Sequence, residues 1–260
     1  MEGRMNLVYR LADGVACQAA PLPDGWVAAA AVIPDVDAPY VALPDAKGYR
    51  LKQERLYREW QAAVRAVPVR LTALIAQGPD VRAEELTPTG ALRGFCVTGG
   101  ESPAVVWIEA DGPEWILTAW TPAGGKRQIA SGSGRLRLPS ACAHAGGLWV
   151  AAELSSGVTV RTLLWDATGN RAAELEGRRP LLTAAALAIG PLLLVEKPDG
   201  GGIVIEAWRA GPDALKLLGR LPGGGDLNLN PSVAVQPDGS MFIAWESCPK
   251  WGWDERVELH

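Results

Sequence analysis

The chain has 260 residues, of which 48% are hydrophobic and 21% are charged, and its 29 acidic and 25 basic residues give a net charge of −4. This composition is typical of a folded globular protein and excludes general disorder. Basic residues form no run in the sequence, which argues against nucleic acid as a partner, because phosphate binding needs a concentrated Lys/Arg surface. Thirty Gly and twenty Pro indicate many turns between short strands.

The N-terminal segment contains strand-like residues, Asn6–Leu11, and no apolar stretch of signal-peptide length. The longest uncharged apolar run, residues 181–195, is too short to span a bilayer and contains a Gly-Pro pair. The four cysteines form no Cys-x-x-Cys pair, so the sequence predicts neither a zinc site nor a disulfide framework. We therefore expect a cytoplasmic protein that has no membrane partner and no cofactor.

Self-similarity along the chain is the most informative feature of the sequence. Four segments share one plan, in which an apolar strand ends in a glutamate and is followed by a turn rich in Gly, Pro or Ser. The glutamates are separated by 44, 43 and 50 residues. They are Glu109, Glu153, Glu196 and Glu246.

The strand that follows in each unit repeats with the same period. Three of these strands end in Trp120, Trp165 and Trp208, which are 45 and 43 residues apart. Several short strands in each unit of 40–50 residues are typical of propeller blades. We expect the three indoles to pack between neighbouring blades.

We predict an all-β protein with a single β-propeller domain of six blades, each of four antiparallel strands. The alternatives are five blades or a fragment of a larger propeller. The second blade carries the weakest signal, because residues 49–65 are strongly charged. Pairing of the two terminal strands would close the ring and remove an open edge. The predicted blades are 15–50, 51–90, 91–137, 138–180, 181–225, and 226–260 completed by 5–13.

The last unit resembles the repeats of TolB-like and sialidase-like propellers. A proline opens its inner strand, residues 231–239 end in a Pro-Asp-Gly turn, the apolar strand 241–246 follows, and Asp254 comes later. The resemblance implies the propeller fold and leaves the activity open, because propellers include hydrolases, lyases, lectins and scaffolds. The Ser-x-Asp-x-Gly-x-x-Trp turn of sialidase repeats does not occur in this sequence.

The recurring glutamates are the first candidate site. If the second strand of each blade ends at one face, Glu109, Glu153, Glu196 and Glu246 form a partial acidic ring there. Such a ring could bind a basic peptide or a divalent cation, although a cation is not favoured, or it could supply paired carboxylates for acid–base chemistry on a sugar. The alternative is structural: each glutamate binds backbone N–H groups or an arginine of the next blade. Repetition of the position across four blades favours this alternative, although Ala30 and Val64 occupy it in the first two.

The loop at 247–253 is the second candidate site. It brings Trp251 and Trp253 close to Glu246 and Asp254 in the sequence. Exposed indoles beside carboxylates commonly bind sugar rings or cations. The alternative is that both indoles pack against the blades.

We expect a non-enzymatic propeller that binds a protein or carbohydrate ligand on the face bearing the glutamates and these two tryptophans. The runner-up is a carbohydrate-active enzyme, a glycoside hydrolase or lyase, with Glu246 and Asp254 as candidate catalytic residues. A structural module of a larger protein is the third possibility. Catalysis through a histidine-activated nucleophile is disfavoured because the chain has only His144 and His260.

Overall fold

A computed structural model describes most of the chain, and every element in the described part is a strand. The all-β class predicted from the sequence is therefore confirmed. Among the described residues, no helix is long and apolar enough to cross a membrane. The described ranges are 16–32, 70–86, 91–111, 113–144, 147–156, 159–184, 190–211, 214–223, 225–236, 240–249 and 258–259.

The first sheet joins strands that are distant in the sequence. Its strands, paired in this order, are β1 (Ala16–Leu22), β2 (Gly25–Val32), β3 (Arg70–Gln77) and β4 (Asp80–Glu85). β2 and β3 form an unbroken antiparallel ladder, although residues 33–69 lie between them in the sequence. This pairing places strands from the first two predicted blades in one sheet, so the boundary predicted at residue 50 does not separate two sheets. The physical reason is a shared buried face, in which small apolar residues of β2 oppose apolar residues of β3.

Three further sheets are built from consecutive strands that pair antiparallel with their sequence neighbours. The second sheet comprises β5 (Ala91–Thr98), β6 (Ala104–Asp111), β7 (Glu114–Thr121) and β8 (Gly125–Ser133). The third comprises β9 (Arg135–His144), β10 (Gly147–Ser156), β11 (Thr159–Trp165) and β12 (Arg171–Glu176). The fourth comprises β13 (Arg178–Thr183), β14 (Leu192–Asp199), β15 (Gly202–Ala210) and β16 (Leu215–Arg220).

The last group contains β17 (Leu227–Val235), β18 (Met241–Cys248) and β19 (Glu258–Leu259). A single parallel pair, Ile203↔Leu227, links it to β15 of the fourth sheet. The described strands thus fall into five groups. Residues 5–13 and 33–69, which belong to the predicted blades, lie outside the described ranges, so the six-blade count stays a prediction.

The exposure of a strand follows its position within its sheet. The second strands β6, β10 and β14 are buried over their central residues on both faces, whereas the outer strands β4 and β8 are largely exposed. A strand with both faces buried needs apolar residues at consecutive positions rather than at alternate ones. The runs Val105–Ile108 and Leu192–Val195 have this pattern and lie between two neighbouring sheets.

The hydrophobic core of the described residues is divided into four clusters, each between two successive groups of strands. Trp120 belongs to the first cluster and Trp165 to the second, while Trp208 packs against the third. Trp165 meets Trp115 of the second sheet edge-on, with ring centroids 6.2 Å apart. The predicted packing of these three tryptophans between sheets is confirmed.

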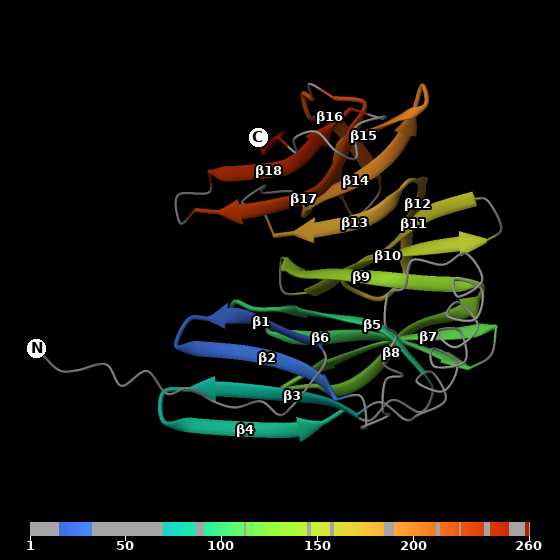
Figure 1. Ribbon diagram of the computed structural model, residues 1–260. Coiled ribbons are helices and arrows are strands. Elements are labelled where there is room, and N and C mark those ends of the chain that lie inside the picture. The colour runs from blue at the N-terminus through green and yellow to red at the C-terminus, as the bar shows by residue number, and fades with distance from the viewer. Residues whose placement is uncertain are drawn as a thin grey trace, which may run out of the picture.

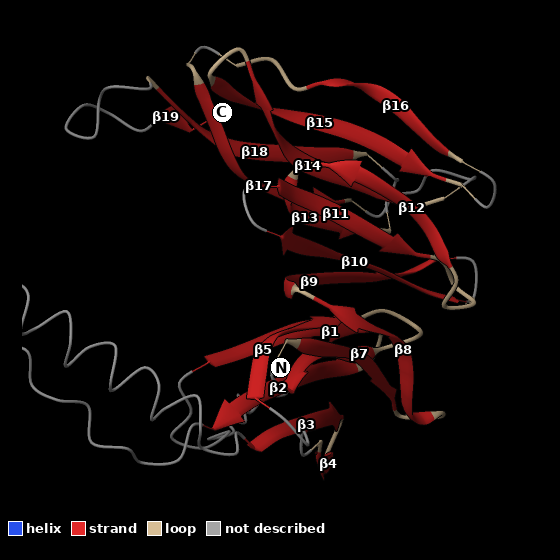
Figure 2. Cartoon of the chain, turned by 90° about the vertical axis from the view of Figure 1, so that its right-hand side faces the viewer, coloured by secondary structure: helices blue, strands red, loops and turns tan. Residues whose placement is uncertain are grey.

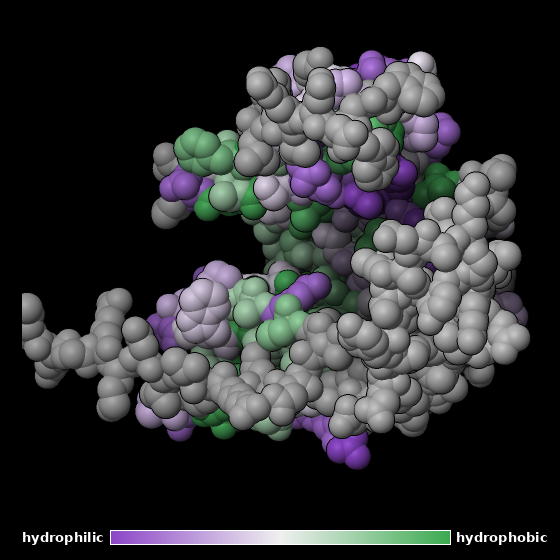
Figure 3. All heavy atoms as spheres, in the orientation of Figure 1, coloured by the Kyte–Doolittle hydropathy of each residue, from purple (hydrophilic) through white to green (hydrophobic). Residues whose placement is uncertain are grey.

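The first strands of the five groups, β1, β5, β9, β13 and β17, all contribute to cavities along a common central space. The sheets follow one another around this space (Figures 1 and 2). Figure 3 shows a deep hollow that opens between the first sheet and the last group. Four-stranded antiparallel sheets arranged about a central space, with apolar packing between neighbours, define a propeller-like fold.

Candidate functional site

The first strands β9, β13 and β17 each contain a bulge opposite the recurring glutamate of the same sheet. In each bulge a residue with left-handed backbone precedes a proline: Leu138 (φ 51°), Arg179 (φ 47°) and Asn230 (φ 52°). Proline cannot donate to the strand ladder, and a bulge takes its residues out of register. The backbone N–H of the residue that precedes the proline is therefore free to donate a hydrogen bond to a neighbouring sheet.

Glu153 and Glu196 accept these N–H groups. The backbone N–H of Arg179 donates to Glu153 Oε2 at 2.9 Å, and that of Asn230 donates to Glu196 Oε1 at 2.8 Å. Both glutamates are fully buried. Their second oxygens are bound by arginines of their own sheets, Arg137 Nε at 2.5 Å from Glu153 and Arg178 Nε at 3.1 Å from Glu196. Each carboxylate therefore joins its own sheet to the next one.

Glu109 is also buried, and its Oε1 accepts a hydrogen bond from the indole Nε1 of Trp107 at 2.8 Å. Burial of Glu109, Glu153 and Glu196 means that these three side chains do not present an open acidic ring to solvent. The expectation of such a ring is corrected for them, because Glu153 and Glu196 bind bulged N–H groups and arginines between sheets, and Glu109 binds the indole of Trp107. The contacts of Glu153 and Glu196 correspond to the structural alternative.

Glu246 differs from the other three. It is half-buried, and its Oε2 accepts a hydrogen bond from the side-chain amide of Asn230 at 2.8 Å. Asn230 Oδ1 in turn accepts from Nη1 of Arg179 at 2.5 Å. In the described part of the chain, no backbone N–H of another sheet donates to Glu246, and β1 pairs with β2 without the bulge found in β13 and β17. We call Arg179, Asn230 and Glu246 the polar triad.

Two residues of the polar triad, Arg179 and Asn230, line the central cavity, and Glu246 is connected to it through its hydrogen bond with Asn230. This cavity has a volume of about 1050 Å³ and is lined by Arg137, Arg179 and Asn230, together with Gln18 and Ser140. Among the described residues, no Asp or Glu side chain lines it. Both guanidiniums have a buried carboxylate nearby, since Arg137 pairs with Glu153 and Arg179 Nη1 lies 3.8 Å from Glu196. The cavity wall is thus rich in hydrogen-bond donors, and the positive charge of its arginines is offset by glutamates behind it.

Three residues of the predicted site, Trp251, Trp253 and Asp254, lie outside the described residues, so the second candidate site, the loop at 247–253, stays a prediction. The described residues contain no group of three or more His, Cys, Asp or Glu side chains that could hold a metal ion. Burial raises the pKa of Cys96 and of Cys142 to about 12, which keeps both thiols protonated and disfavours them as nucleophiles.

Sequence reasoning missed the part that Arg137, Arg179 and Asn230 play at the cavity. A signal was nevertheless present in the sequence. The first strands of three successive units each contain a proline, at positions 139, 180 and 231. A proline inside a strand indicates a bulge or an edge. Recognising that bulge in each unit would have located the donors that face the glutamates.

The class of protein that the fold defines is an all-β, propeller-like domain. No protein-family model matches the chain, and no curated protein sequence is significantly similar to it. Among solved structures, a mutant of the NanB sialidase from Streptococcus pneumoniae is similar with a TM-score of 0.46 and 11% identity. NanB with Optactamide is similar with a TM-score of 0.43 and 10% identity. Each match covers 74% of this chain and 34% of the NanB chain, so this chain corresponds to about a third of that protein.

Proposed function

We propose that the protein is a non-enzymatic, ligand-binding propeller whose ligand enters the central cavity and contacts Arg179 and Asn230, which Glu246 helps to position. The observation that carries this proposal is the different environment of Glu246. Glu153 and Glu196 are buried and bonded between sheets, whereas Glu246 is half-buried and is hydrogen-bonded to Asn230, a residue of the cavity lining. A polar network at the mouth of a large concave space is a common form of ligand site.

The chemistry of the cavity wall favours a neutral ligand rich in oxygen. Each guanidinium has five N–H donors, and the contacts of Arg137 and Arg179 use only part of them. Because nearby carboxylates balance the arginine charges, the wall suits hydroxyl and carbonyl acceptors better than a free anion. A carbohydrate is the ligand we propose, and a protein segment with exposed carbonyl groups is the other partner that this wall would accept.

A non-enzymatic role is favoured by the distribution of carboxylates. A glycosidase needs two carboxyl groups about 5–10 Å apart that reach substrate and water. Glu153 and Glu196 are fully buried and each is bonded to an arginine and a backbone N–H, so neither is available to exchange a proton with a substrate.

The test is a glycan array followed by thermal-shift titration of any glycan that binds. A specific ligand at a hundred times its Kd should stabilise the wild type by about 2.7 kcal/mol. Arg179→Gln and Glu246→Gln should each reduce the shift severalfold, while Glu174→Gln, which alters an exposed ion-pair residue on β12, should leave it unchanged. A glycan that binds Arg179→Gln and Glu246→Gln as it binds the wild type would contradict the proposed site, and failure of all glycans to bind would contradict a carbohydrate ligand.

The enzyme alternative rests on the same half-buried carboxylate, Glu246, with Asp254 as its partner. It is tested with p-nitrophenyl glycosides as substrates for wild type, Glu246→Gln and Asp254→Asn. We expect no turnover in any of the three proteins. Wild-type hydrolysis that both substitutions abolish would replace the binding proposal with a glycoside hydrolase.

A further inference from the structure

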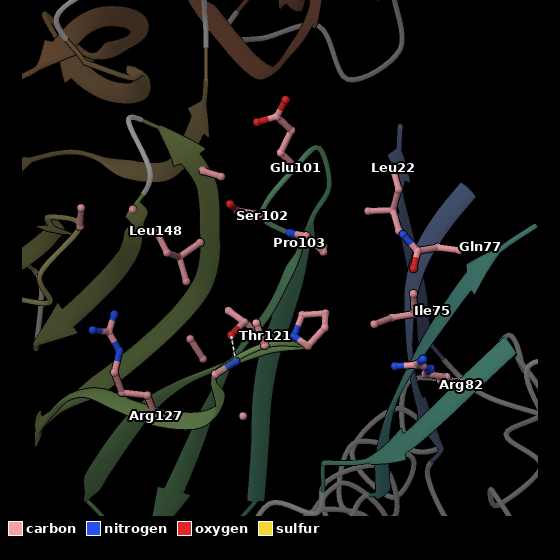
Figure 4. Close-up of a pocket in the computed structure, with 18 residues that line it drawn as sticks. Leu22, Ile75, Gln77, Arg82, Glu101, Ser102, Pro103, Thr121, Arg127 and Leu148 are labelled. Atoms are coloured by element: carbon pink, nitrogen blue, oxygen red, sulfur yellow. Dashed lines mark hydrogen bonds between the residues drawn. The ribbon is translucent and has the colours of Figure 1, made fainter. Parts of the chain in front are cut away.

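A second cavity lies at the other end of the sheets, where first strands turn into second strands and third strands into fourth strands. Its volume is about 570 Å³, within the range of small-molecule sites. Three sheets contribute to it: the first through the ends of β1, β3 and β4, the second through the β5–β6 loop and the β7–β8 turn, and the third through β10. Figure 4 shows these segments converging on one space.

The inner wall of this pocket is apolar. Leu22, Ile75 and Ala119 are buried side chains of its lining, and Leu148 and Pro103 are partly buried. These residues belong to three sheets, so the apolar wall exists only once the sheets have assembled. An apolar ligand surface that covers it would gain about 25 cal/mol for each Å² removed from water.

Two arginines stand at the rim of the pocket. Arg82 comes from the outer strand β4 and Arg127 from the outer strand β8, and both side chains are exposed. Figure 4 shows them on opposite sides of the pocket, with Thr121 between them. In the part of the chain that the structure describes, neither guanidinium has an ion pair or a hydrogen bond, in contrast to Arg137 and Arg178, which bind buried glutamates. Glu101 is the single acidic residue among the described lining residues, so the rim has a net positive charge.

We propose that this pocket binds a small organic anion with an apolar body, an aromatic or branched aliphatic carboxylate or sulfonate. The apolar body would cover Leu22, Ile75 and Leu148, and the anionic group would bind Arg82 or Arg127. A guanidinium offers parallel N–H donors to the two oxygens of such a group, which gives bonds about twice as strong as neutral ones. This site is separate from the central cavity, and the proposal goes beyond the proposed function.

The experiment compares two fluorescent probes of similar shape. The sulfonate 8-anilinonaphthalene-1-sulfonate carries the proposed anionic group, and N-phenyl-1-naphthylamine is its uncharged counterpart. We expect the sulfonate to bind the folded wild type saturably at one site and more tightly than the uncharged probe. Its affinity should fall as salt is raised from low to high concentration, because the attraction to exposed arginines is screened.

Variants assign the binding to the pocket. Arg82→Gln and Arg127→Gln should together weaken sulfonate binding by about tenfold or more, because each removes a charge-assisted bond, and should leave the uncharged probe unaffected. Arg135→Gln, an exposed arginine outside the pocket lining, is the matched control and should bind like wild type. Ala119→Leu, which fills the apolar wall, should weaken both probes, with thermal melting used to confirm that this variant folds. Non-saturable sulfonate binding, or equal binding by wild type and the double arginine variant, would overturn the proposal.

Discussion

At the scale of single residues, the environment of a repeated carboxylate depends on what the next sheet offers it. Glu196 meets a bulged N–H of β17 and an arginine of β13, and it is fully buried. Glu246 stands at the same place in its unit but binds a side-chain amide and keeps part of its surface exposed. Residues at one repeat position can thus be fully buried and bonded between sheets in one unit and partly exposed in another.

Glu196→Gln tests the structural role. Loss of the negative charge weakens two charge-assisted hydrogen bonds of a buried group, so we expect the free energy of unfolding to fall by about 2–3 kcal/mol. Glu174→Gln removes a carboxylate that binds Arg161 on the surface and should cost less than about 1 kcal/mol. Both values come from urea unfolding curves. Equal losses in the two variants would show that the buried glutamate is not an important link between sheets.

At the scale of elements, the bulges in the first strands provide hydrogen bonds between neighbouring sheets. A regular strand uses its N–H groups within its own ladder, whereas the bulges of β13 and β17 direct one N–H to the preceding sheet. The cost is a left-handed backbone at a residue with a side chain, which L-residues other than Gly, Asn and Asp rarely adopt. Asn230 suits this conformation, and Leu138 does not.

Leu138→Gly should therefore stabilise the protein. Leu138 has φ 51° and is 44% exposed, so the substitution relieves backbone strain and loses little packing. We expect a gain of about 0.5–1 kcal/mol in the free energy of unfolding. The matched control is Leu217→Gly on β16, because Leu217 is 45% exposed and does not have a positive φ. For this variant we expect the free energy of unfolding to fall by about 1 kcal/mol. If both substitutions destabilise the protein to a similar degree, the bulge at Leu138 is not strained.

At the scale of the whole molecule, the sheets are separate units held together by apolar clusters and by a few close backbone contacts. One contact joins the first two sheets, where the N–H of Gly100 donates to the carbonyl oxygen of Pro21 at 2.8 Å. The neighbouring Gly99 lies so close that a Cβ there would be 2.1 Å from the same oxygen. Glycine is required at this position because the two backbones approach directly.

Gly99→Ala should loosen the first sheet from the second. Relief of the overlap requires a shift of backbone, and we expect the free energy of unfolding to fall by about 2 kcal/mol. Amide hydrogen exchange should quicken in β1, β2 and β3 and remain unchanged in the third sheet, because each sheet has its own hydrogen-bond ladder. Ser102→Ala, an exposed change in the same loop, is the control. Uniformly faster exchange in every sheet would mean that the sheets open together.

The four repeated glutamates and three repeated tryptophans illustrate how far prediction from sequence reached. Their spacing indicated an all-β repeat fold and the packing of Trp120, Trp165 and Trp208 between sheets, because period and turn chemistry are local properties of the chain. The boundary at residue 50 failed for the opposite reason. β2 pairs with β3 across residues 33–69, and no local pattern specifies a pairing over that separation.

The sequence by itself determined that the described chain consists of short strands joined by turns and that a glutamate recurs in four of the units. These follow from the alternation of residues and from Gly, Pro and Asp in turns, which act over a few residues. Tertiary structure alone decided which carboxylates are fully buried between sheets and which stays partly exposed. Glu153 and Glu196 each meet a bulged N–H of the following sheet, from β13 and β17, whereas Glu246 binds a side-chain amide of its own group of strands. Contacts between sheets join residues far apart in the chain, so their chemistry appears only when the sheets have assembled.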